Sequence, residues 1–548
     1  MVEWSTILGE VREARSDFVQ TEGMENESLL LERLRPMLPQ LKEQLFSYHN
    51  ELSASQGEQK SAKLRSKEFI LGTRAALRFG MCCMTFEGDR IRRTLQNYAV
   101  LKCQIHVCLS AILSLKGGDS KCRILSAQFL SNLVTSNYES AKEVSISLPV
   151  SPSEEWISSN IRENVFDMNK EELPKFIEGP NWVDAFLSSV KSGDRNGSAA
   201  VVAALHNCIV SLEEGKDDSF VKKVASDPLL VSSLLRNFVS ANKASNQDDY
   251  DNWDEATEWI FILIARLMSF GLFSLMYTGI SRSNLTEIQN VLPEQNILLN
   301  CMIKQVEDHK ESLQYTDETY EFLAMLLCRL YELSESNDSI DIDEDEKPDL
   351  LLLQAAVCSI LDVLSIALGF DNPQSQNLRQ HFGLTTNILQ QSAQVLGKLV
   401  DDLTLKNLGV KAREMKISNE EQSLITVLVQ FLGNLCYKCR HNQDLMRTTL
   451  VQPRLDKATE GANERNALHV LLSCTTFSTC CFTLREWSVI AIRNVLENNA
   501  ENQHVVADLD AQSAVQSAAL QSAGVQVQLD QHGKVSLSTL KEDDNNNQ

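Results

Sequence analysis

The feature that most constrains the fold of this chain is a short pattern that recurs along it. Apolar residues stand at positions i, i+1, i+4 and i+5, and asparagine at i+3, in Phe129–Val134, Ala204–Ile209, Phe431–Cys436 and Ala491–Leu496. At about 100° per residue of an α-helix, the four apolar residues form one stripe, and the asparagine lies roughly 130° from its centre. The pattern therefore predicts helices that bury one face, and we expect the asparagine to point away from the core.

The two C-terminal copies of this pattern match further. Asn442-Gln443 follows Asn434 at the same interval at which Asn502-Gln503 follows Asn494. We expect each trailing asparagine to cap the next helix, because its side chain can accept a bond from the unpaired backbone N–H groups of the first turn. A helix, a turn and a capped helix, repeated, form the unit of an α-solenoid. Because the copies are irregularly spaced, the sequence predicts an all-α, armadillo- or HEAT-like α-solenoid.

Composition agrees with helices and disfavours several kinds of partner. A chain of 548 residues is too long for one compact core, and 22 Gly and 11 Pro leave few of the turns that β-sandwiches need. The net charge of −23 would repel nucleic acid and anionic lipid. We therefore expect other proteins as partners and no nucleic acid.

Cysteine usage and the apolar segments indicate the compartment. The 14 cysteines are scattered without a regular framework, and Met1–Ser5 does not begin a signal peptide, so we expect reduced thiols in the cytosol or nucleus. The apolar run Trp259–Tyr277 contains Arg266 and follows an acidic segment. This run predicts a buried pair of helices, and we expect no membrane span.

An acidic segment divides the chain. Glu335–Asp349 holds eight Asp or Glu among its fifteen residues and cannot bury a core, so it predicts a linker. It separates an N-terminal helical repeat region, 1–334, from C-terminal repeats at 350–509, and a tail at 510–548 follows. Further expected features are breaks at Ser145–Glu155 and 240–254, and helices at Met1–Val19, Ser28–Glu51, 64–84, 94–115 and 121–136.

The tail carries the one β signal in the sequence. Val525, Val527 and Leu529 alternate with polar residues, as do Val535 and Leu537 after a turn. A hairpin of this length is marginal alone, so we expect a small β-hairpin that docks on the last helices and caps the end of the solenoid. The polar end of the tail is expected to be disordered.

Three blocks in the C-terminal region form a specific signature. The first is Leu432–Lys438 with Asn442-Gln443-Asp444; the second is Arg485–Asn494, closed by Glu497-Asn498-Asn499 and Asn502-Gln503; the third is Ala523–Asp530 with Gly533-Lys534-Val535. Together they cover roughly residues 424–540 and resemble the Ataxin-10 family, and a weaker similarity to that family is present at Leu361–Leu364.

This resemblance implies an armadillo-like solenoid in the cytoplasm that binds proteins and self-associates. It also implies a link to cytokinesis and, in animals, to neuronal survival and neurite growth, with perinuclear, midbody or centrosomal positions in the cell. The chain departs from the family at Thr475–Leu484, where the family has an acidic stretch with Asn-Pro. This departure leaves any function of that loop open.

The candidate protein-binding residues are Asn434, Asn494, Arg485 and Trp487. In armadillo repeats, an asparagine on the groove-lining helix can hold an extended peptide backbone through a paired donor and acceptor. The alternative is that the asparagine only ends the apolar stripe or bonds to a neighbouring repeat, since no Trp lies one turn from any repeat asparagine. Trp487 is likewise either an exposed contact or a packing anchor between repeats.

No motif in the sequence indicates catalysis, a metal or a cofactor. Cys436 and Cys439 form a C-x-x-C pair, yet Cys436 occupies a stripe position and is expected to be buried as a small hydrophobe. The leading hypothesis is a non-enzymatic, protein-binding scaffold that resembles Ataxin-10. One alternative is an armadillo-type adaptor for a small GTPase or a transport cargo, which would bind a basic peptide in an acidic groove. Another is an enzyme with an unrecognised thiol or zinc site.

Overall fold

The computed structural model describes residues 32, 34–54, 67–84, 89–114, 119–148, 150, 181–191, 195–214, 216, 218–244, 253–308, 315–336, 349–407, 417–452, 465–479, 481–507, 525–529 and 535–539. Within these ranges the secondary structure is almost entirely helical, with two small antiparallel pairs of strands. The predicted all-α solenoid fold is confirmed. The chain divides into two compact units, Met1–Ile360 and Leu361–Gln548.

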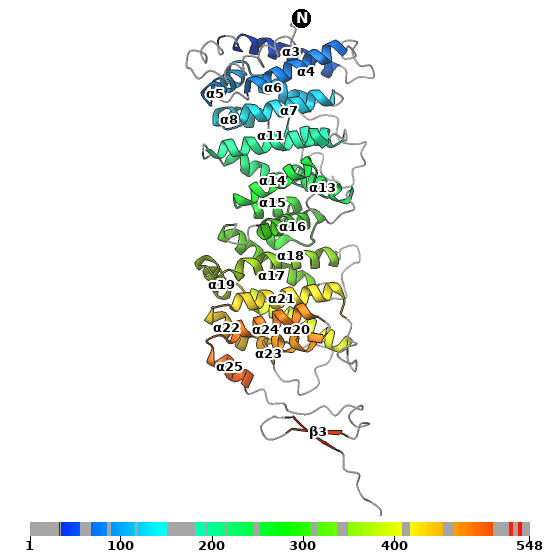
Figure 1. The fold of residues 1–548 in the computed structure, drawn as a ribbon, viewed down its shortest axis with the longest axis vertical. Coiled ribbons are helices and arrows are strands. Elements are labelled where there is room, and N and C mark those ends of the chain that lie inside the picture. Colours follow the sequence, from blue (N-terminus) through cyan, green and yellow to red (C-terminus); the bar gives the residue numbers. More distant parts are fainter. Residues whose placement is uncertain are drawn as a thin grey trace, which may run out of the picture. The chain divides into compact units, whose positions relative to one another are not determined.

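The first unit contains a row of four helices that pack one against the next. These are α4 (Lys67–Met84), α7 (Ser120–Val134), α11 (Arg195–Glu214) and α14 (Glu255–Ser269), here called the N-terminal row (Figure 1). The unit also contains α3 (Met37–Ala54), α5 (Asp89–Asn97), the π-helix η1 (Tyr98–Lys102), α6 (Ile105–Ser114), α8 (Tyr138–Ser147), α10 (Trp182–Lys191), α12 (Ser219–Ser226), α13 (Pro228–Ala244), α15 (Phe273–Ser281), the 3-10 helix η4 (Leu285–Glu287), α16 (Pro293–Asp308), α17 (Asp317–Ser336) and the start of α18 (Leu350–Gly369).

The apolar stripes predicted from the repeated pattern hold the N-terminal row together. Phe129 and Leu130 of α7 are fully buried, as are Ala204 and Cys208 of α11. α4 approaches α7 closely at Gly80, where an added Cβ would lie 2.2 Å from the Phe129 ring. The prediction that these helices bury one face is confirmed, and burial of a side chain the size of Phe129 contributes about 1.5–3 kcal/mol.

Three copies of the pattern end in the same turn. The residue four positions after the asparagine has a positive φ, which is 53° at Ser136, 50° at Lys438 and 54° at Asn498. This left-handed residue ends one helix and redirects the chain into the next. The helices that follow are α8, α22 (Arg440–Thr448) and α25 (Ala500–Ala507). The repeat unit is therefore a helix, a left-handed turn and a shorter helix.

One expected helix of the first unit is broken. The segment 94–115 is not a single helix, because α5 passes into η1 and the chain turns at Gln104, with a φ of 51°, before α6 begins. A left-handed conformation is rare outside glycine, so nothing in the sequence signals this turn. The expected helices 64–84 and 121–136 correspond to α4 and α7. α3 overlaps the expected helix Ser28–Glu51 and ends just beyond it. Met1–Val19 lies outside the described residues.

The apolar run Trp259–Tyr277 is a buried helix pair, as predicted. α14 and α15 meet at a break that bends the pair by 112°, and Gly271, with a φ of 73°, lies in this break. The sequence pattern did not single out α18, which is the one helix in the described part of the chain long and apolar enough by composition to cross a membrane. More than half of α18 is buried inside the protein, as in the core helix of a helical domain.

The second unit contains the rest of α18 and the C-terminal repeats. Its elements are α19 (Pro373–Thr385), α20 (Ile388–Lys406), α21 (Asn419–Cys436), α22, β1 (Leu450–Val451), β2 (Arg465–Asn466), α23 (Ala467–Ser473), the 3-10 helix η8 (Cys474–Thr479), α24 (Phe482–Leu496), α25, β3 (Val525–Leu529) and β4 (Val535–Thr539). α21 and α24 pack side by side (Figure 1). Phe431 and Cys436 of α21 are fully buried, whereas Ile492 and Leu496 of α24 are half-buried. The fourth stripe is therefore only partly covered.

Both strand pairs belong to the second unit. β1 and β2 pair antiparallel, with Leu450 opposite Asn466, and no alternating pattern in the sequence predicts this pair. β3 and β4 pair antiparallel with Val527 opposite Leu537 and Leu529 opposite Val535, so the predicted hairpin is confirmed. Docking of this hairpin on the last helices stays a prediction, because residues 508–524 lie outside the described residues.

Several expected breaks fall largely outside the described residues. These are the acidic segment between Glu335 and Asp349, the segment 240–254 and the loop Ser145–Glu155, of which only the ends are described. The segment Thr475–Leu484 is expected to be a loop, but its described residues belong mostly to η8 and to the first turn of α24.

A buried histidine in the first unit makes its stability depend on pH. His106 in α6 is 4% exposed, its Nδ1 has no partner among the described residues, and burial lowers its pKa to about 4. The unfolded chain binds a proton at this histidine below a pH of about 6.5, whereas the folded chain binds it only below a pH of about 4. As the pH falls from about 6.5 to about 4, we expect the unit to lose up to about 3 kcal/mol of unfolding free energy at this site.

Urea unfolding across this pH range checks the expectation. His106→Leu should flatten the acid side of the profile, and His504→Leu, which removes an exposed histidine of α25, should leave it unchanged. An unaltered profile in His106→Leu would show that this histidine does not set the acid dependence.

Candidate protein-binding groove

The predicted asparagines Asn434 and Asn494 join neighbouring helices. Asn434 Nδ2 donates to the carbonyl of Ser365 in α18 at 2.9 Å, and Asn494 Nδ2 donates to the carbonyl of Gly433 in α21 at 3.0 Å. Asn207 of α11 likewise donates to the hydroxyl of Ser131 in α7 at 2.7 Å. Asn494 is only 7% exposed, so the expectation that it points away from the core is wrong. Peptide binding by Asn434 and Asn494 stays a prediction.

The trailing asparagines do not cap the helices that follow, so that prediction is wrong. Each lies inside its helix and donates two hydrogen bonds backwards, because side chains near a helix start point toward its N-terminus. One acceptor lies at the end of the preceding helix and the other in the previous repeat. The acceptors are the carbonyls of Leu435 and Arg379 for Asn442, both at 2.8 Å, and those of Val495 and Gln443 for Asn502, at 3.0 and 2.8 Å. The cap of α25 is Asn499, whose Oδ1 accepts from the Asn502 N–H.

The other two predicted residues lie at the start of α24. Arg485 is exposed and Trp487 is half-buried. Within the described ranges, neither side chain makes a hydrogen bond, an ion pair or a ring contact. The four predicted residues are thus distributed over helix junctions and a helix surface, and a binding role for Arg485 and Trp487 stays a prediction.

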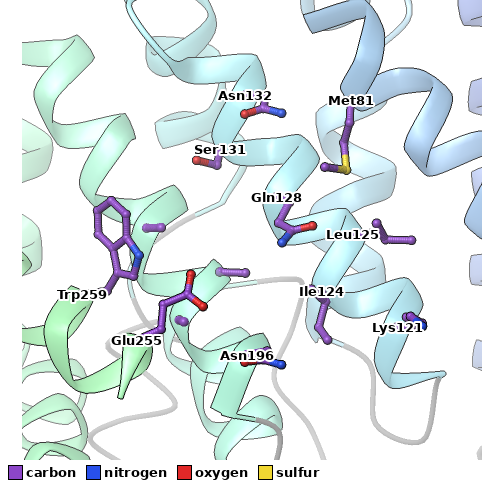
Figure 2. Close-up of a pocket in the computed structure, with 13 residues that line it drawn as sticks. Met81, Lys121, Ile124, Leu125, Gln128, Ser131, Asn132, Asn196, Glu255 and Trp259 are labelled. Carbon is purple, nitrogen blue, oxygen red and sulfur yellow. The ribbon is translucent and has the colours of Figure 1, made fainter. Parts of the chain in front are cut away.

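A groove of about 550 Å³ crosses the N-terminal row, along most of α7 and over the first halves of α11 and α14. Its lining, drawn in Figure 2, consists of Met81 from α4; Lys121, Ile124, Leu125, Gln128, Ser131 and Asn132 from α7; Asn196, Ala199, Ala200 and Ala203 from α11; and Glu255 and Trp259 from α14. This surface, called the row groove below, brings together residues from helices that are widely separated in sequence.

Three amide side chains in the row groove are available to a ligand. Gln128 and Asn196 are exposed and Asn132 is half-buried, and none of the three makes a side-chain hydrogen bond within the described part of the chain. Each amide offers one acceptor and two donors, the set that pairs with both the N–H and the C=O of a peptide. Asn132 therefore differs from Asn207, whose amide is bound to α7.

The floor of the row groove is made of small residues. Ala199 and Ala200 of α11 are buried and Ala203 is half-buried. Because alanine has no side chain beyond Cβ, another polypeptide can approach this helix closely. Small residues at the floor and amides at the sides suit a main chain better than a bulky ligand.

Two unpaired charges lie in the row groove. Lys121 on α7 and Glu255 on α14 are exposed, and neither forms an ion pair with another described residue. The neighbouring Asp254 caps α14 and pairs with Arg195 of α11, with 2.7 Å between Arg195 Nη2 and Asp254 Oδ1. The Arg195 guanidinium holds the pKa of Asp254 down to about 2, so this arginine is already neutralised.

The aromatic residue of the row groove is Trp259, which sequence reasoning missed as a site residue. Its ring lies 5.6 Å from that of His206, measured between centroids, and it is half-buried. Burial lowers the pKa of His206, so this ring is neutral at pH 7. No Trp lies one turn from a repeat asparagine on the same helix, whereas Trp259 reaches the groove of Asn132 from another repeat.

The C-x-x-C pair belongs to the second unit, whereas the row groove belongs to the first. Cys436 is fully buried, as predicted, and Cys439 is 8% exposed. Burial raises the pKa of both thiols, which keeps them protonated at neutral pH. No group of three or more His, Cys, Asp or Glu within the described ranges has the geometry to hold a metal ion.

A smaller groove of about 360 Å³ lies over α18, α21 and α24 in the second unit. It is lined by Asp362, Asn419, Gln422, Ser423, Thr426, Val427, Gln430 and Thr483. These side chains include no aromatic residue that could anchor a partner. The row groove is therefore the stronger candidate for binding.

The fold defines the class of this protein, which is an all-α protein built of armadillo- or HEAT-like helical repeats. Residues 425–538 match the spinocerebellar ataxia type 10 protein domain. The resemblance to the Ataxin-10 family predicted from the sequence is therefore confirmed for this C-terminal region.

Individual relatives agree with this assignment. The chain is 28% identical over 138 residues to the Ataxin-10 homolog of Dictyostelium discoideum, a match that covers 25% of this chain and 20% of that protein. It is 28% identical over 134 residues to Ataxin-10 of Homo sapiens, covering 24% and 25% of the two chains. The match to Ataxin-10 of Xenopus tropicalis is longer, with 23% identity over 379 residues and coverage of 65% and 69%.

The matches to the Dictyostelium and human proteins are short, and this chain covers a quarter or less of the length of those relatives. Among solved structures, a circular tandem repeat protein with novel repeat topology matches 92% of this chain and 97% of its own at 11% identity, with a TM-score of 0.26. A TM-score this low carries no weight in the fold assignment, which rests on the helices themselves.

Proposed function

We propose that this chain is a non-enzymatic scaffold that binds other proteins through the row groove. The observation that carries the proposal is the groove itself, with three unbonded amides above an alanine floor. Stacked helices hold the backbone that carries these side chains in place before a partner arrives, so that no binding free energy is lost in ordering the main chain of the groove. The resemblance to Ataxin-10 supports a protein-binding role.

The finer part of the proposal follows the Ataxin-10 resemblance. We propose that the protein acts in the cytoplasm, at perinuclear, midbody or centrosomal positions, that it contributes to cytokinesis and, in animals, to neuronal survival and neurite growth, and that it self-associates. These roles rest on the matched C-terminal domain, residues 425–538, which does not include the row groove.

A second candidate function is an armadillo-type adaptor that binds a small GTPase or a transport cargo through a basic peptide. The observation that favours it is the unpaired carboxylate of Glu255 in the row groove. For an enzyme with a thiol or zinc site, the burial of Cys436 and Cys439 gives no support.

A long side chain on the floor of the row groove is expected to prevent partner proteins from binding. Ala203→Arg places a long charged side chain on the groove floor while keeping a residue that favours helix. In proximity labelling of cells that express the full chain, we expect proteins captured by the wild type to fall about tenfold or more with Ala203→Arg.

Ala507→Arg is the matched control, because Ala507 is an exposed alanine at the end of α25, in the other unit. It adds the same charge outside the groove and should leave the captured set unchanged. Circular dichroism of both variants checks that the helices remain. A captured set that is the same for Ala203→Arg and wild type would refute binding through the row groove.

A further inference from the structure

Two residues of α14 form a distinct end of the row groove. Glu255 and Trp259 are four positions apart on the same helix, so their side chains lie on one face. Figure 2 shows the carboxylate of Glu255 beside the indole of Trp259, both facing the groove. A carboxylate next to an aromatic face is the environment that suits a lysine or arginine side chain, which gains both an ion pair and a cation–π contact.

The charges around this end favour a cation. Glu255 and Glu258 are exposed, and neither has an ion-pair partner among the described residues. The nearby Arg195 is bound to Asp254 and Thr257, so it does not neutralise Glu255. Among the described residues, Lys121 is the one basic residue that lines the row groove, and it belongs to α7, on the far side of α11.

The amides of the row groove match an extended main chain. Gln128 and Asn132 are one helical turn apart on α7, which separates them by about 5–6 Å. Residues i and i+2 of an extended peptide are about 6.5–7 Å apart and point the same way. Two successive amides can therefore bind alternate peptide groups, while the alanine floor of α11 lets the main chain approach.

We propose that the row groove binds an extended peptide segment whose lysine or arginine side chain stacks on Trp259 and pairs with Glu255. The proposal rests on the proposed function, since it names the partner chemistry of the same groove. The peptide main chain bonds to Gln128, Asn132 and Asn196, and its basic side chain lies along α14. Residues with acidic side chains are disfavoured at the Glu255 end and tolerated near Lys121.

The test uses a fluorescein-labelled decapeptide of alternating Ser and Lys, with the full chain at about 0.1 M salt, read by fluorescence anisotropy. Glu255→Gln is expected to raise the dissociation constant about three- to fivefold, and Trp259→Ala about tenfold. The double variant should raise the dissociation constant by less than the product of the two single factors, because both residues hold the same basic side chain of the peptide. A decapeptide of alternating Ser and Glu should bind at least tenfold more weakly than the Lys probe.

Glu139→Gln is the matched control. Glu139 is an exposed glutamate in the first turn of α8, as Glu255 is in the first turn of α14, but it lies outside the groove. It should change the dissociation constant less than twofold. Because Trp259 is half-buried, Trp259→Phe accompanies Trp259→Ala; it keeps an aromatic ring and should weaken binding less. N-methylation of the probe's backbone should weaken binding as well, because it removes main-chain donors.

The proposal is overturned if the Lys probe does not bind, or if Glu255→Gln and Glu139→Gln weaken it equally, which would mean attraction to the net charge of −23 alone. Proximity labelling separates this failure from that of the proposed function. If Ala203→Arg removes cellular partners and Glu255→Gln does not, the groove binds proteins, but the pairing of a partner's basic side chain with Glu255 is refuted. If neither variant removes partners, both ideas fail.

Discussion

Replacing Gln443 with alanine is expected to lower the unfolding free energy of the C-terminal repeats by about 3 kcal/mol, the cost of leaving several buried polar groups unpaired. Gln443 is 2% exposed, and its Nε2 donates to the carbonyls of Asn494 and Glu497 at 2.9 and 3.2 Å. Its Oε1 accepts from the Asn499 amide at 3.3 Å. One side chain therefore joins α22 to the end of α24 and to the cap of α25.

Gln503→Ala is the matched control, because Gln503 occupies the same position in the last repeat. It is exposed, and its Nε2 makes a single bond to the carbonyl of Leu496 at 2.8 Å. Gln503→Ala should lower the unfolding free energy by less than about 1 kcal/mol, since water can replace this hydrogen bond. Hydrogen exchange of peptides from α22 and α24 measures both effects, and about 3 kcal/mol corresponds to a roughly 100-fold increase in the opening equilibrium. Equal effects of the two substitutions would contradict the role assigned to the buried amide.

A single methyl group added at Gly433 is expected to cost about 2–3 kcal/mol, because it would force two packed helices apart. A Cβ at this position would lie 2.6 Å from the Cβ and 2.8 Å from the Cα of Ala491. The second of these atoms belongs to the backbone of α24, so no change of rotamer relieves the clash. The displacement would also strain the bond from Asn494 to the Gly433 carbonyl.

Two further variants define this prediction. Gly72→Ala changes a glycine in α4 where an added Cβ meets nothing within 4 Å, so it should stabilise the protein by about 0.5–1 kcal/mol through helix propensity. Ala491→Gly combined with Gly433→Ala should recover part of the loss, because it removes one of the two clashing carbons. Urea unfolding measures these differences. A neutral Gly433→Ala would mean that α21 and α24 can separate without cost.

The apolar stripes were predicted well because they depend on neighbouring residues of one helix. Phe129 and Phe431, each placed at the start of a stripe, are both fully buried. The tail hairpin was predicted for a similar reason, since alternation with period two is visible in a few consecutive residues. Burial of Cys436 followed from its place in a stripe.

The predictions that failed depended on what lies next to a residue in space. Asn442 was expected to cap α22, but the carbonyls of Arg379 and Leu435 lie within reach of its amide. Asn494 was expected to face outward, and it bonds to Gly433 of the neighbouring helix. Each asparagine has the same hydrogen-bonding groups in either role, so the sequence could not choose between them.

The row groove shows the same limit. Asn132 was identified from its pattern, but Trp259 and Glu255 lie on a helix more than a hundred positions later, and no local spacing connects them. By itself the sequence determined that the chain forms repeated helices with one buried face, because the period of apolar residues is a local property. Only the tertiary structure decided which asparagines are used for packing and which remain unbonded in a groove, because that depends on how each stripe interlocks with the next.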